Sequence, residues 1–417
     1  MTENNKIRDR FLNITDVLIS FFIILQIVAI GFSIALSSIS LGTWIILWIF
    51  KISFQNHNGC YKLIWERYRI LIISLVFFIL CDFLARMFAV YREGALTDLK
   101  RYLLIIIFFS NQTIIKERTE IFKAVFFILL GFSLISLYEI GRYLYMLKDL
   151  LASKSFSEIR IDYLSYPITN AEVKMLLLLF IFPSLMSKEK QQIKKTYIVL
   201  ISLPILVSVY LTQSRNVYIA LFVSLFIFGL FFNRKFLVVL IILSALFILA
   251  APSSMTNRLT SAFDTQHESN KSRLIMWGVG IKIFKDYPVL GTGENEITSI
   301  YKSYKTPEFH GEGSHFHSNY IMILVTMGLT GFLIYIAFWL SLFYYLIGDY
   351  RKYAYNPDRN LILGIILSVI SLHVSGFFEW NFGDWEVMTV MYYLISIMFI
   401  LKSINLNENI YGRTKSQ

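Results

Sequence analysis

The sequence predicts an all-α polytopic membrane protein with about twelve transmembrane helices. Hydrophobic residues make up 56% of the 417 residues and charged residues only 16%, and the mean hydropathy is +0.60. Apolar runs near the length that crosses a bilayer recur along the chain between short polar segments. Soluble globular domains lack both features, so we expect a single membrane domain over residues 1–417.

Twelve apolar runs are candidate spans. An α-helix rises 1.5 Å per residue, so about 20 residues cross a hydrocarbon core of about 30 Å. Three short runs, 39–53, 101–112 and 172–187, are expected to be tilted, paired or partly interfacial. The complete set is 16–37, 39–53, 68–90, 101–112, 121–147, 172–187, 196–211, 216–233, 236–252, 317–347, 361–378 and 386–402.

The net charge of +11 orients the chain and does not indicate a nucleic-acid partner. Residues 253–318, between the ninth and tenth spans, contain seven basic and seven acidic residues. The connections on the opposite side are basic, as the positive-inside rule requires, at 6–10, 51–69, 116–123, 188–195, 234–235, 351–359 and 402–415. Both termini are therefore predicted to be cytoplasmic and the 253–318 loop to lie outside.

The first apolar run is expected to remain as a membrane anchor. It is too long for a signal peptide and lacks a cleavage site of small residues. Cys60 falls in an inner loop and Cys81 within a span, so we expect neither a disulfide nor a thiolate metal site.

Polar residues interrupt the apolar stretch 196–233 at residues 212–216, with the sequence TQSRN. One helix of that length would extend about 57 Å, nearly twice the hydrocarbon thickness, so the chain is expected to turn near Arg215. Ser214 or Thr212 is then placed to cap the following helix. Arg215 beside the positive end of that helix forms a candidate anion site. The alternative is that Arg215 extends to lipid headgroups.

The outer loop carries a second arginine, Arg273. Apolar residues at helical spacing predict an amphipathic helix over 272–286, which lies at the membrane interface and ends before Pro288. Gly291 and Gly293 then permit a tight turn; it is not a phosphate loop, because the Walker lysine and the preceding strand are missing. By its position alone, Arg273 fits a site residue or a solvated helix charge.

Three of the six histidines, His310, His315 and His317, lie within eight residues at the end of this loop. His315 and His317 alternate, so both could bind one metal ion from an extended segment. The nearby acids, Glu308 and Glu312, have neither helical nor hairpin spacing to them, and no metal is expected. A general base needs only one histidine at the edge of a cavity. His317, at the start of an apolar run, suits that role better than His310.

Three motifs follow one another between residues 205 and 335. They are LTQSR at 211–215; SRLIMW at 272–277 with Pro288 and GTG at 291–293; and HS at 317–318 followed, after nine residues, by GLTG at 328–331. Their order and spacing resemble the bacterial O-antigen ligases, within the superfamily that also includes the O-antigen polymerases of the membrane-embedded GT-C type. Asn216 stands where many members have a small residue, and Ser318 replaces the familiar asparagine. Neither departure removes a charged or titratable group.

The resemblance implies a GT-C-like fold in the bacterial inner membrane, with 253–318 as a large periplasmic loop containing short helices. It implies a metal-independent glycosyltransferase of lipopolysaccharide biosynthesis that uses no cofactor. The donor would be O-antigen on undecaprenyl pyrophosphate, and the acceptor a hydroxyl of the lipid A-core oligosaccharide. Membrane lipids would be further partners.

The resemblance also assigns roles to three residues. Arg215 and Arg273 would bind the pyrophosphate, because guanidinium groups offer forked donors to phosphate oxygens. His317 would accept the proton of the acceptor hydroxyl or orient it. His315 is a secondary substrate-binding candidate, which would flank the site or bind lipid headgroups. An O-antigen polymerase, which joins lipid-linked repeat units, would share this arrangement and remains the alternative.

Several further residues are secondary candidates, because each also has a structural explanation. The acidic pair, Glu379 and Asp384, fits a solvated loop better than a site. Aromatic residues near spans commonly anchor the membrane interface. A flippase should carry mid-span charges and repeat symmetry, and a purely lipid-binding protein would not need His317. The secondary candidates are Arg142, Arg160, Glu379, Asp384, Trp385, Tyr163, Tyr166 and Trp380.

Overall fold

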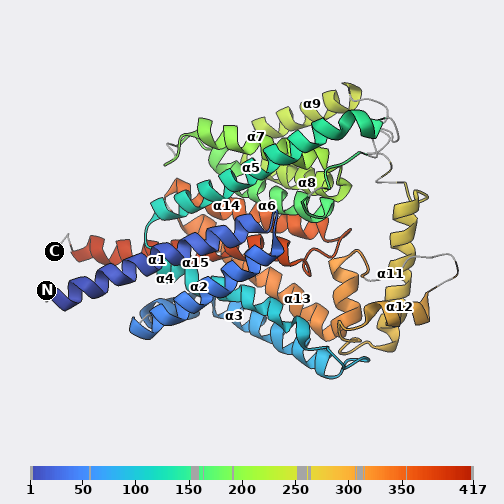
Figure 1. Ribbon diagram of the computed structural model, residues 1–417, viewed down its shortest axis with the longest axis horizontal. Helices are drawn as coiled ribbons and strands as arrows, with labels where there is room; N and C mark the ends of the chain where they lie inside the picture. The colour runs from blue at the N-terminus through green and yellow to red at the C-terminus, as the bar shows by residue number, and fades with distance from the viewer. Residues whose placement is uncertain are drawn as a thin grey trace.

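The computed structural model is all-helical over the residues that it describes, which confirms the predicted class (Figure 1). These residues are 3–55, 58–151, 159–162, 164–189, 192–250, 261, 264–305, 307, 313, 315–353 and 355–414. The helices are α1 (Glu3–Ala29), α2 (Ile34–Phe54), α3 (Asn58–Met87), the 3-10 helix η1 (Thr97–Ile105), α4 (Ile106–Ile114), α5 (Arg118–Leu151), α6 (Pro167–Met186), α7 (Lys195–Leu211), α8 (Arg215–Phe232), α9 (Arg234–Ala250), α11 (Glu268–Asp286), α12 (Ile297–Tyr304), α13 (Asn319–Lys352), α14 (Asn356–Ser375) and α15 (Trp385–Thr414).

A helix occupies the position of each of the twelve predicted spans. Nine of the described helices are long and apolar enough to cross a membrane, whereas α7 and α9 have 17 residues each and α4 has nine. The predicted span 101–112 is divided between η1 and α4, and α4 packs against α15. It is therefore a short element within the bundle rather than a regular span.

The boundary between the first two spans differs from the prediction. The chain turns at residues 30–33, and Ser33 begins α2 by accepting a hydrogen bond of 3.3 Å from the backbone N–H of Leu36. The apolar runs predict this boundary at residue 38. Because apolar residues continue through the turn, hydropathy does not reveal it.

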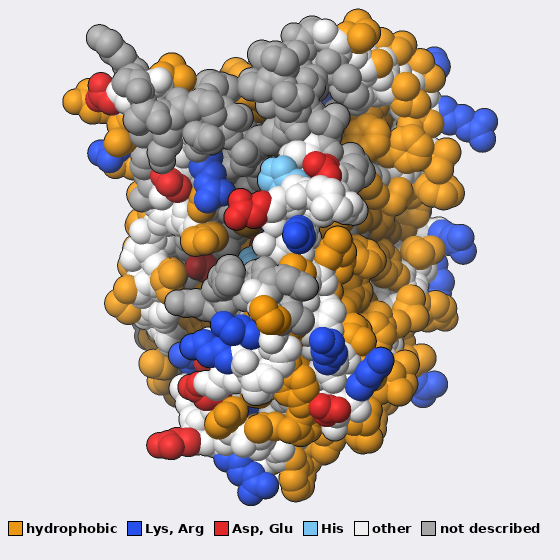
Figure 2. Space-filling view, turned by 90° about the vertical axis from the view of Figure 1, so that its right-hand side faces the viewer, with side chains coloured by type: hydrophobic (Ala, Val, Ile, Leu, Met, Phe, Trp, Pro, Cys, Tyr) orange, Lys and Arg blue, Asp and Glu red, His pale blue; other side chains and the backbone are white. Residues whose placement is uncertain are grey.

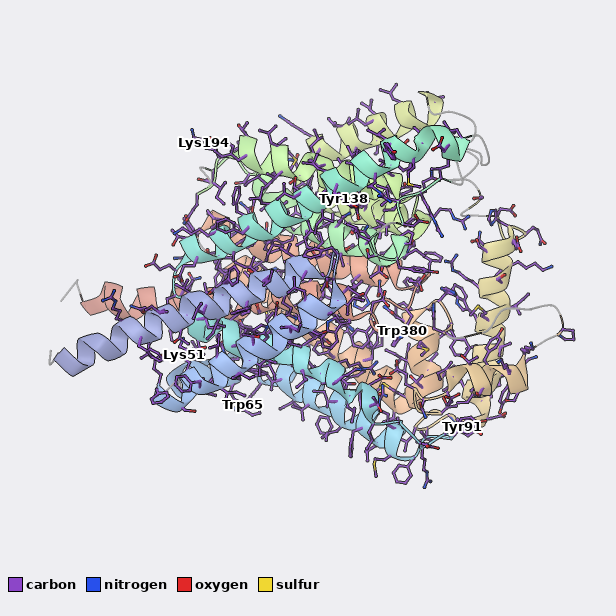
Figure 3. All side chains as sticks on the ribbon, in the orientation of Figure 1. Lys51, Trp65, Tyr91, Tyr138, Lys194 and Trp380 are labelled. Atoms are coloured by element: carbon purple, nitrogen blue, oxygen red, sulfur yellow. The ribbon has the colours of Figure 1, made fainter. Side chains whose placement is uncertain are left out.

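The two ends of the bundle differ in character. Both termini lie at one end, and α11 and α12 lie at the other, which we call the loop end (Figure 1). Lys51 and Lys194 lie toward the termini, whereas Tyr91 and Trp380 lie toward the loop end (Figure 3). Viewed from the loop end, charged side chains interrupt the surface while hydrophobic side chains cover one flank (Figure 2). This arrangement agrees with termini that share one side of a membrane.

Two lysines between the spans are paired with carboxylates. Lys51 forms an ion pair with Asp16 and donates to the carbonyl of Thr113 at 2.6 Å. Lys174 forms an ion pair with Glu139, and both side chains are fully buried. Pairing offsets the high cost of placing single charges in an apolar medium.

Helix α13 is broken at Gly328, whose φ of +63° lies in the left-handed region. The turn at Gly291, with a φ of +69°, packs directly against this break. A Cβ on Gly291 would lie 2.4 Å from the carbonyl carbon of Thr326, and one on Gly328 would lie 2.4 Å from the carbonyl oxygen of Val289. Both positions therefore require glycine.

Backbone hydrogen bonds join the two segments across this break. The N–H of Thr292 donates to Val325 at 2.8 Å, and the N–H of Leu329 donates to Pro288 at 2.8 Å. The outer segment thus satisfies backbone groups that the interrupted helix leaves open. We call residues 288–293 and 325–329 together the glycine clamp.

A second contact holds the same outer segment to α3 and η1. Arg86 donates to Asp82 at 2.9 Å, and Arg101 lies 2.7 Å from Glu294 and 3.2 Å from Asp82. Arg86 also pairs with Glu294. These two arginines and two carboxylates, which we call the ion quartet, balance each other in charge.

Candidate functional site

Arg215 begins α8 immediately after a tight turn, as the sequence predicts. Gln213 takes a left-handed conformation in that turn, with a φ of +53°. The predicted cap is wrong: the Ser214 hydroxyl donates to the carbonyl of Pro167 at 3.4 Å, and that of Thr212 to Val209 at 2.7 Å. The hydroxyl groups therefore bond to carbonyls instead of to the free N–H groups of α8.

A cavity of about 300 Å³ brings Arg215 and Arg273 together. Arg215 donates to the hydroxyls of Ser261 at 2.8 Å and Ser269 at 2.5 Å. Arg160, a secondary candidate, lines the same cavity, whereas Arg142 lies on an exposed part of α5. The complete lining is Arg160, Ile168, Gln213, Ser214, Arg215, Asn216, Ile219, Ser261, His267, Ser269, Asn270, Arg273 and Phe378.

Arg273 belongs to α11, which extends over Glu268–Asp286 and so confirms the predicted helix before Pro288. Among the described residues, none forms a hydrogen bond or ion pair with Arg273, and its Nε atom is buried. Burial lowers the pKa of Arg273, and the charge of Glu379 only partly opposes that effect. An unpaired guanidinium at a polar cavity is well suited to bind an anion.

The segment His315-Phe316-His317 directs its two histidines toward one side. Phe316 is fully buried in the cluster of α11, α12 and α13, and its carbonyl accepts a 3.0 Å hydrogen bond from Trp277 Nε1. The two imidazole rings lie 4.1 Å apart between centroids. His317 has a φ of +45°, an uncommon conformation for a residue other than glycine. Its placement two residues before α13 confirms its predicted position at the mouth of a span.

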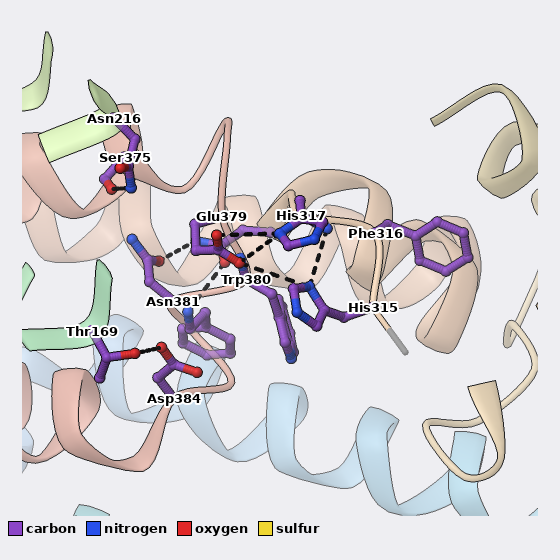
Figure 4. A network of polar contacts seen from close by, with 12 residues as sticks. Thr169, Asn216, His315, Phe316, His317, Ser375, Glu379, Trp380, Asn381 and Asp384 are labelled. Carbon is purple, nitrogen blue, oxygen red and sulfur yellow. Dashed lines mark hydrogen bonds and ion pairs between the residues drawn. The ribbon is translucent and has the colours of Figure 1, made fainter. Parts of the chain in front are cut away.

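Glu379 contacts both histidines (Figure 4). The Nδ1 atom of His317 lies 3.0 and 3.2 Å from the two carboxylate oxygens of Glu379, and Nδ1 of His315 lies 3.7 Å from the nearer one. Burial acts to raise the pKa of Glu379, but the hydrogen bond and charge of His317, with the charge of His315, hold that pKa below its ordinary value. An ionised carboxylate only accepts hydrogen bonds, so Nδ1 of His317 carries its proton.

The arginine cavity and the histidine pair act on each other electrostatically. Burial lowers the pKa of His315, and the charges of His317 and Arg273 lower it further. Phe378 lines the cavity, and Glu379, which binds His317, follows it in the chain. The two groups of residues therefore lie next to each other.

A buried chain of polar side chains also connects the two halves (Figure 4). Asn216, next to Arg215, donates to Glu172 at 3.1 Å and to Ser375 at 2.8 Å. Asn381 donates to Glu172 at 3.3 Å and accepts from Asn319 at 2.7 Å. Asn216, which departs from the resembled pattern, thus has a structural role in fixing the start of α8.

The structure corrects the interpretation of the acidic pair as a solvated loop. Glu379 is only 7% exposed. Asp384 accepts a hydrogen bond of 3.0 Å from Thr169, and burial raises its pKa to about 7. Sequence reasoning underrated Glu379 because it lies far from His317 along the chain, and no local pattern joins the two.

The other secondary candidates differ in position. Trp380 donates its backbone N–H to Glu379 at 3.1 Å, Trp385 begins α15, and Tyr166 is exposed just before α6. Four residues weighed in the sequence lie outside the described residues: Tyr163, Glu308, His310 and Glu312.

Comparison with known families finds a match for part of the chain. Residues 199–336 match the family described as O-antigen ligase. This match covers 138 of the 417 residues and supports membership of the O-antigen ligase and polymerase superfamily. This O-antigen ligase segment contains Arg215, Arg273 and His317, but ends before Glu379. A search of curated protein sequences finds no significant match.

Proposed function

We propose that this protein is an O-antigen ligase of the bacterial inner membrane. It transfers O-antigen polysaccharide from undecaprenyl pyrophosphate to a sugar hydroxyl of the lipid A-core oligosaccharide. The site then faces the periplasm, the 253–318 segment is a periplasmic loop, and both termini are cytoplasmic. The distribution of basic residues and the shared location of the two termini in Figure 1 support this orientation.

The observation that carries the proposal is the gathering of Arg215 and Arg273 at one cavity beside His317 and Glu379. A pyrophosphate would receive forked hydrogen bonds from the guanidinium groups, which stay charged. Arg273 has no hydrogen-bond or ion-pair partner among the described residues and would gain hydrogen bonds to the bound pyrophosphate. These hydrogen bonds would offset the cost of burying its guanidinium group. Neutral sugars alone would not need two such cations.

The transfer proceeds in one displacement. The acceptor hydroxyl oxygen attacks the anomeric carbon, the bond from that carbon to the pyrophosphate oxygen breaks, and the hydroxyl proton passes to Nε2 of His317. Glu379 accepts a hydrogen bond from Nδ1–H, which leaves the Nε2 lone pair available and stabilises the imidazolium that forms. Arg215 and Arg273 stabilise the charge that develops on the leaving pyrophosphate, and His315 flanks the substrate.

No metal ion or cofactor is required in this mechanism. The arginines supply the positive charge that divalent cations supply in many sugar-nucleotide transferases. Transfer should accordingly persist in excess chelator, and its loss would contradict the metal-independent step.

Purified protein tests the proposal when it is given lipid-linked O-polysaccharide and either lipid A-core or a second lipid-linked repeat unit. Attachment to lipid A-core without chain growth is expected. Elongation of the lipid-linked chain instead would identify a polymerase of the same superfamily.

The His317→Gln variant tests the mechanism. It should lower the transfer rate by about 10² to 10⁴-fold, with an unchanged membrane level and elution volume. Transfer at the wild-type rate would exclude His317 as the base. The Lys302→Gln variant is a control from an exposed position outside the cavity.

A further inference from the structure

The two histidines and Glu379 form a cluster of three metal-ligating side chains. One ligand atom from each of His315, His317 and Glu379 lies within 4.8 Å of the other two. The sequence offered no third ligand at a suitable spacing, whereas the fold supplies one from the connection between α14 and α15. We infer that these three residues bind a divalent transition metal ion such as Zn²⁺, and that the bound ion inhibits transfer.

The separations of the ligand atoms fit such an ion. Ligands that lie 2.0 to 2.1 Å from a tetrahedral zinc ion are about 3.4 Å apart. Here His317 Nδ1 lies 3.0 Å and His315 Nδ1 lies 3.7 Å from Glu379 Oε1. Two imidazoles and one carboxylate are a common zinc ligand set that leaves one coordination position open.

The surrounding structure holds the ligands in place before any metal binds. Phe316, between the two histidines, is fully buried, and its carbonyl is fixed by Trp277. Glu379 is held by the backbone N–H of Trp380 at 3.1 Å. Only small side-chain shifts are therefore needed, which lowers the cost of assembling the site.

Inhibition follows from which nitrogen of His317 the metal ion occupies. The proposed base is Nε2, which has a free lone pair because the proton of the neutral ring resides on Nδ1. A metal ion on Nδ1 displaces that proton and also the hydrogen bond to Glu379. The neutral ring then carries its proton on Nε2, where it cannot accept another one from the acceptor hydroxyl.

Arg273 sets the strength of this site. Its positive charge acts on His315 and Glu379, so it repels a cation held between them. Removal of that charge should therefore strengthen metal binding, the opposite of the effect expected if Arg273 only supported the fold.

Cobalt(II) is a direct probe, because its visible absorption reports tetrahedral coordination by nitrogen and oxygen ligands. The purified full-length protein in detergent is titrated with Co²⁺ without any substrate, and Zn²⁺ is then added as a competitor. We expect one equivalent to bind, and His315→Gln and Glu379→Gln each to weaken binding by at least about tenfold. Arg273→Gln should lower the Kd, and Lys302→Gln, at an exposed position outside the cavity, should leave it unchanged.

The site would be overturned if the Co²⁺ absorption bands are absent, or if both ligand variants bind Co²⁺ as tightly as the wild-type protein does. The His315→Gln variant keeps the test valid if Glu379→Gln does not fold, because His315 lies in a partly exposed loop.

The inhibitory role rests on the proposed function and is measured separately. Stoichiometric Zn²⁺ should abolish transfer by the wild-type protein, and chelator should restore it. Bound zinc with undiminished transfer would overturn the inhibition. Failure of transfer without metal would instead contradict the proposed function, while the cobalt titration would still report on the site.

Discussion

Two groups of arginines at the loop end of this molecule have opposite surroundings. Arg86 and Arg101 are matched by the carboxylates of Asp82 and Glu294, and Arg86 is only 1% exposed at its side chain. Arg273, at the polar cavity, has no hydrogen bond or ion pair within the described part of the chain, and Arg215 donates to serine hydroxyls.

This difference supports a structural role for Arg86 and Arg101 and the proposed role of Arg215 and Arg273 in binding an anion. A matched buried quartet holds the outer segment against α3 and η1, and has no remaining charge for a ligand. The cavity retains positive charge that an anion can neutralise. Both regions contain arginines. The groups that surround each arginine, and not the residue type, therefore distinguish the two regions.

The largest effect on stability should come from breaking the quartet. Arg86→Gln leaves Asp82 and Glu294 with a single cation between them and should lower the free energy of unfolding by about 3 to 5 kcal/mol. Thermal unfolding in detergent measures this change. The double variant with Asp82→Asn should recover part of the loss, because charge balance returns. If Arg86→Gln lowers the free energy of unfolding by no more than Arg273→Gln does, the two groups of arginines do not differ in their contribution to stability.

Arg273→Gln should change function and not stability. It removes a half-buried cation that has no hydrogen-bond or ion-pair partner among the described residues, so the free energy of unfolding should not fall. Transfer should fall by about 100-fold or more, because the charge developing on the leaving group loses a donor. Lys282→Gln, at an exposed position of the same helix, is the matched control. Normal transfer by Arg273→Gln would exclude a role for this arginine in the reaction.

The glycine clamp should be sensitive to a single methyl group. Gly291→Ala forces a Cβ to within 2.4 Å of backbone at a positive φ, and should cost at least about 2 kcal/mol of folding free energy. Gly278→Ala, where a Cβ meets nothing within 4 Å, should be neutral or slightly stabilising. Equal unfolding midpoints for the two variants would show that the clamp does not hold the outer segment.

Asp384 extends the comparison to carboxylates, with a smaller effect. Asp82 has two arginine partners, whereas Asp384 is hydrogen-bonded to Thr169 and has a pKa of about 7. Its pKa in the folded state is raised, so the protonated acid stabilises the fold at low pH, and this contribution is lost as pH rises through about 7.

The unfolding midpoint should therefore fall between pH 5 and pH 8 by an amount equivalent to about 1 to 2 kcal/mol, allowing for partial exposure. Asp384→Asn should flatten the profile, while Asp98→Asn at an exposed position should not. A profile unchanged in Asp384→Asn would contradict the assigned pKa.

Sequence reasoning predicted the features that local patterns encode. Hydropathy located the helices, helical spacing located α11, and chain length required the turn before Arg215. The loop carrying Glu379 could not be assigned, because its contact with His317 joins segments distant in the chain and is created by the packing of α13 against α14. The break at Gly328 was also missed, since an apolar run through a broken helix resembles a continuous span.

Metal ligation illustrates the same limit. His315 and His317 lie two residues apart, so the sequence shows them as a pair. The third possible ligand, Glu379, lies close to them only in the folded chain. The partners of each arginine are likewise a property of the fold. From sequence alone, Arg86 and Arg273 are both basic residues near an outer connection.

Binding of undecaprenyl pyrophosphate tests most directly whether Arg215 and Arg273 hold a pyrophosphate, as we propose. Wild-type protein should bind this lipid more tightly than undecaprenol of the same chain length. Arg273→Gln should lose most of that preference, while Lys302→Gln, a basic residue outside the cavity, should keep it. Equal affinity of the wild-type protein for the two lipids, or a preference unaffected by Arg273→Gln, would contradict the account.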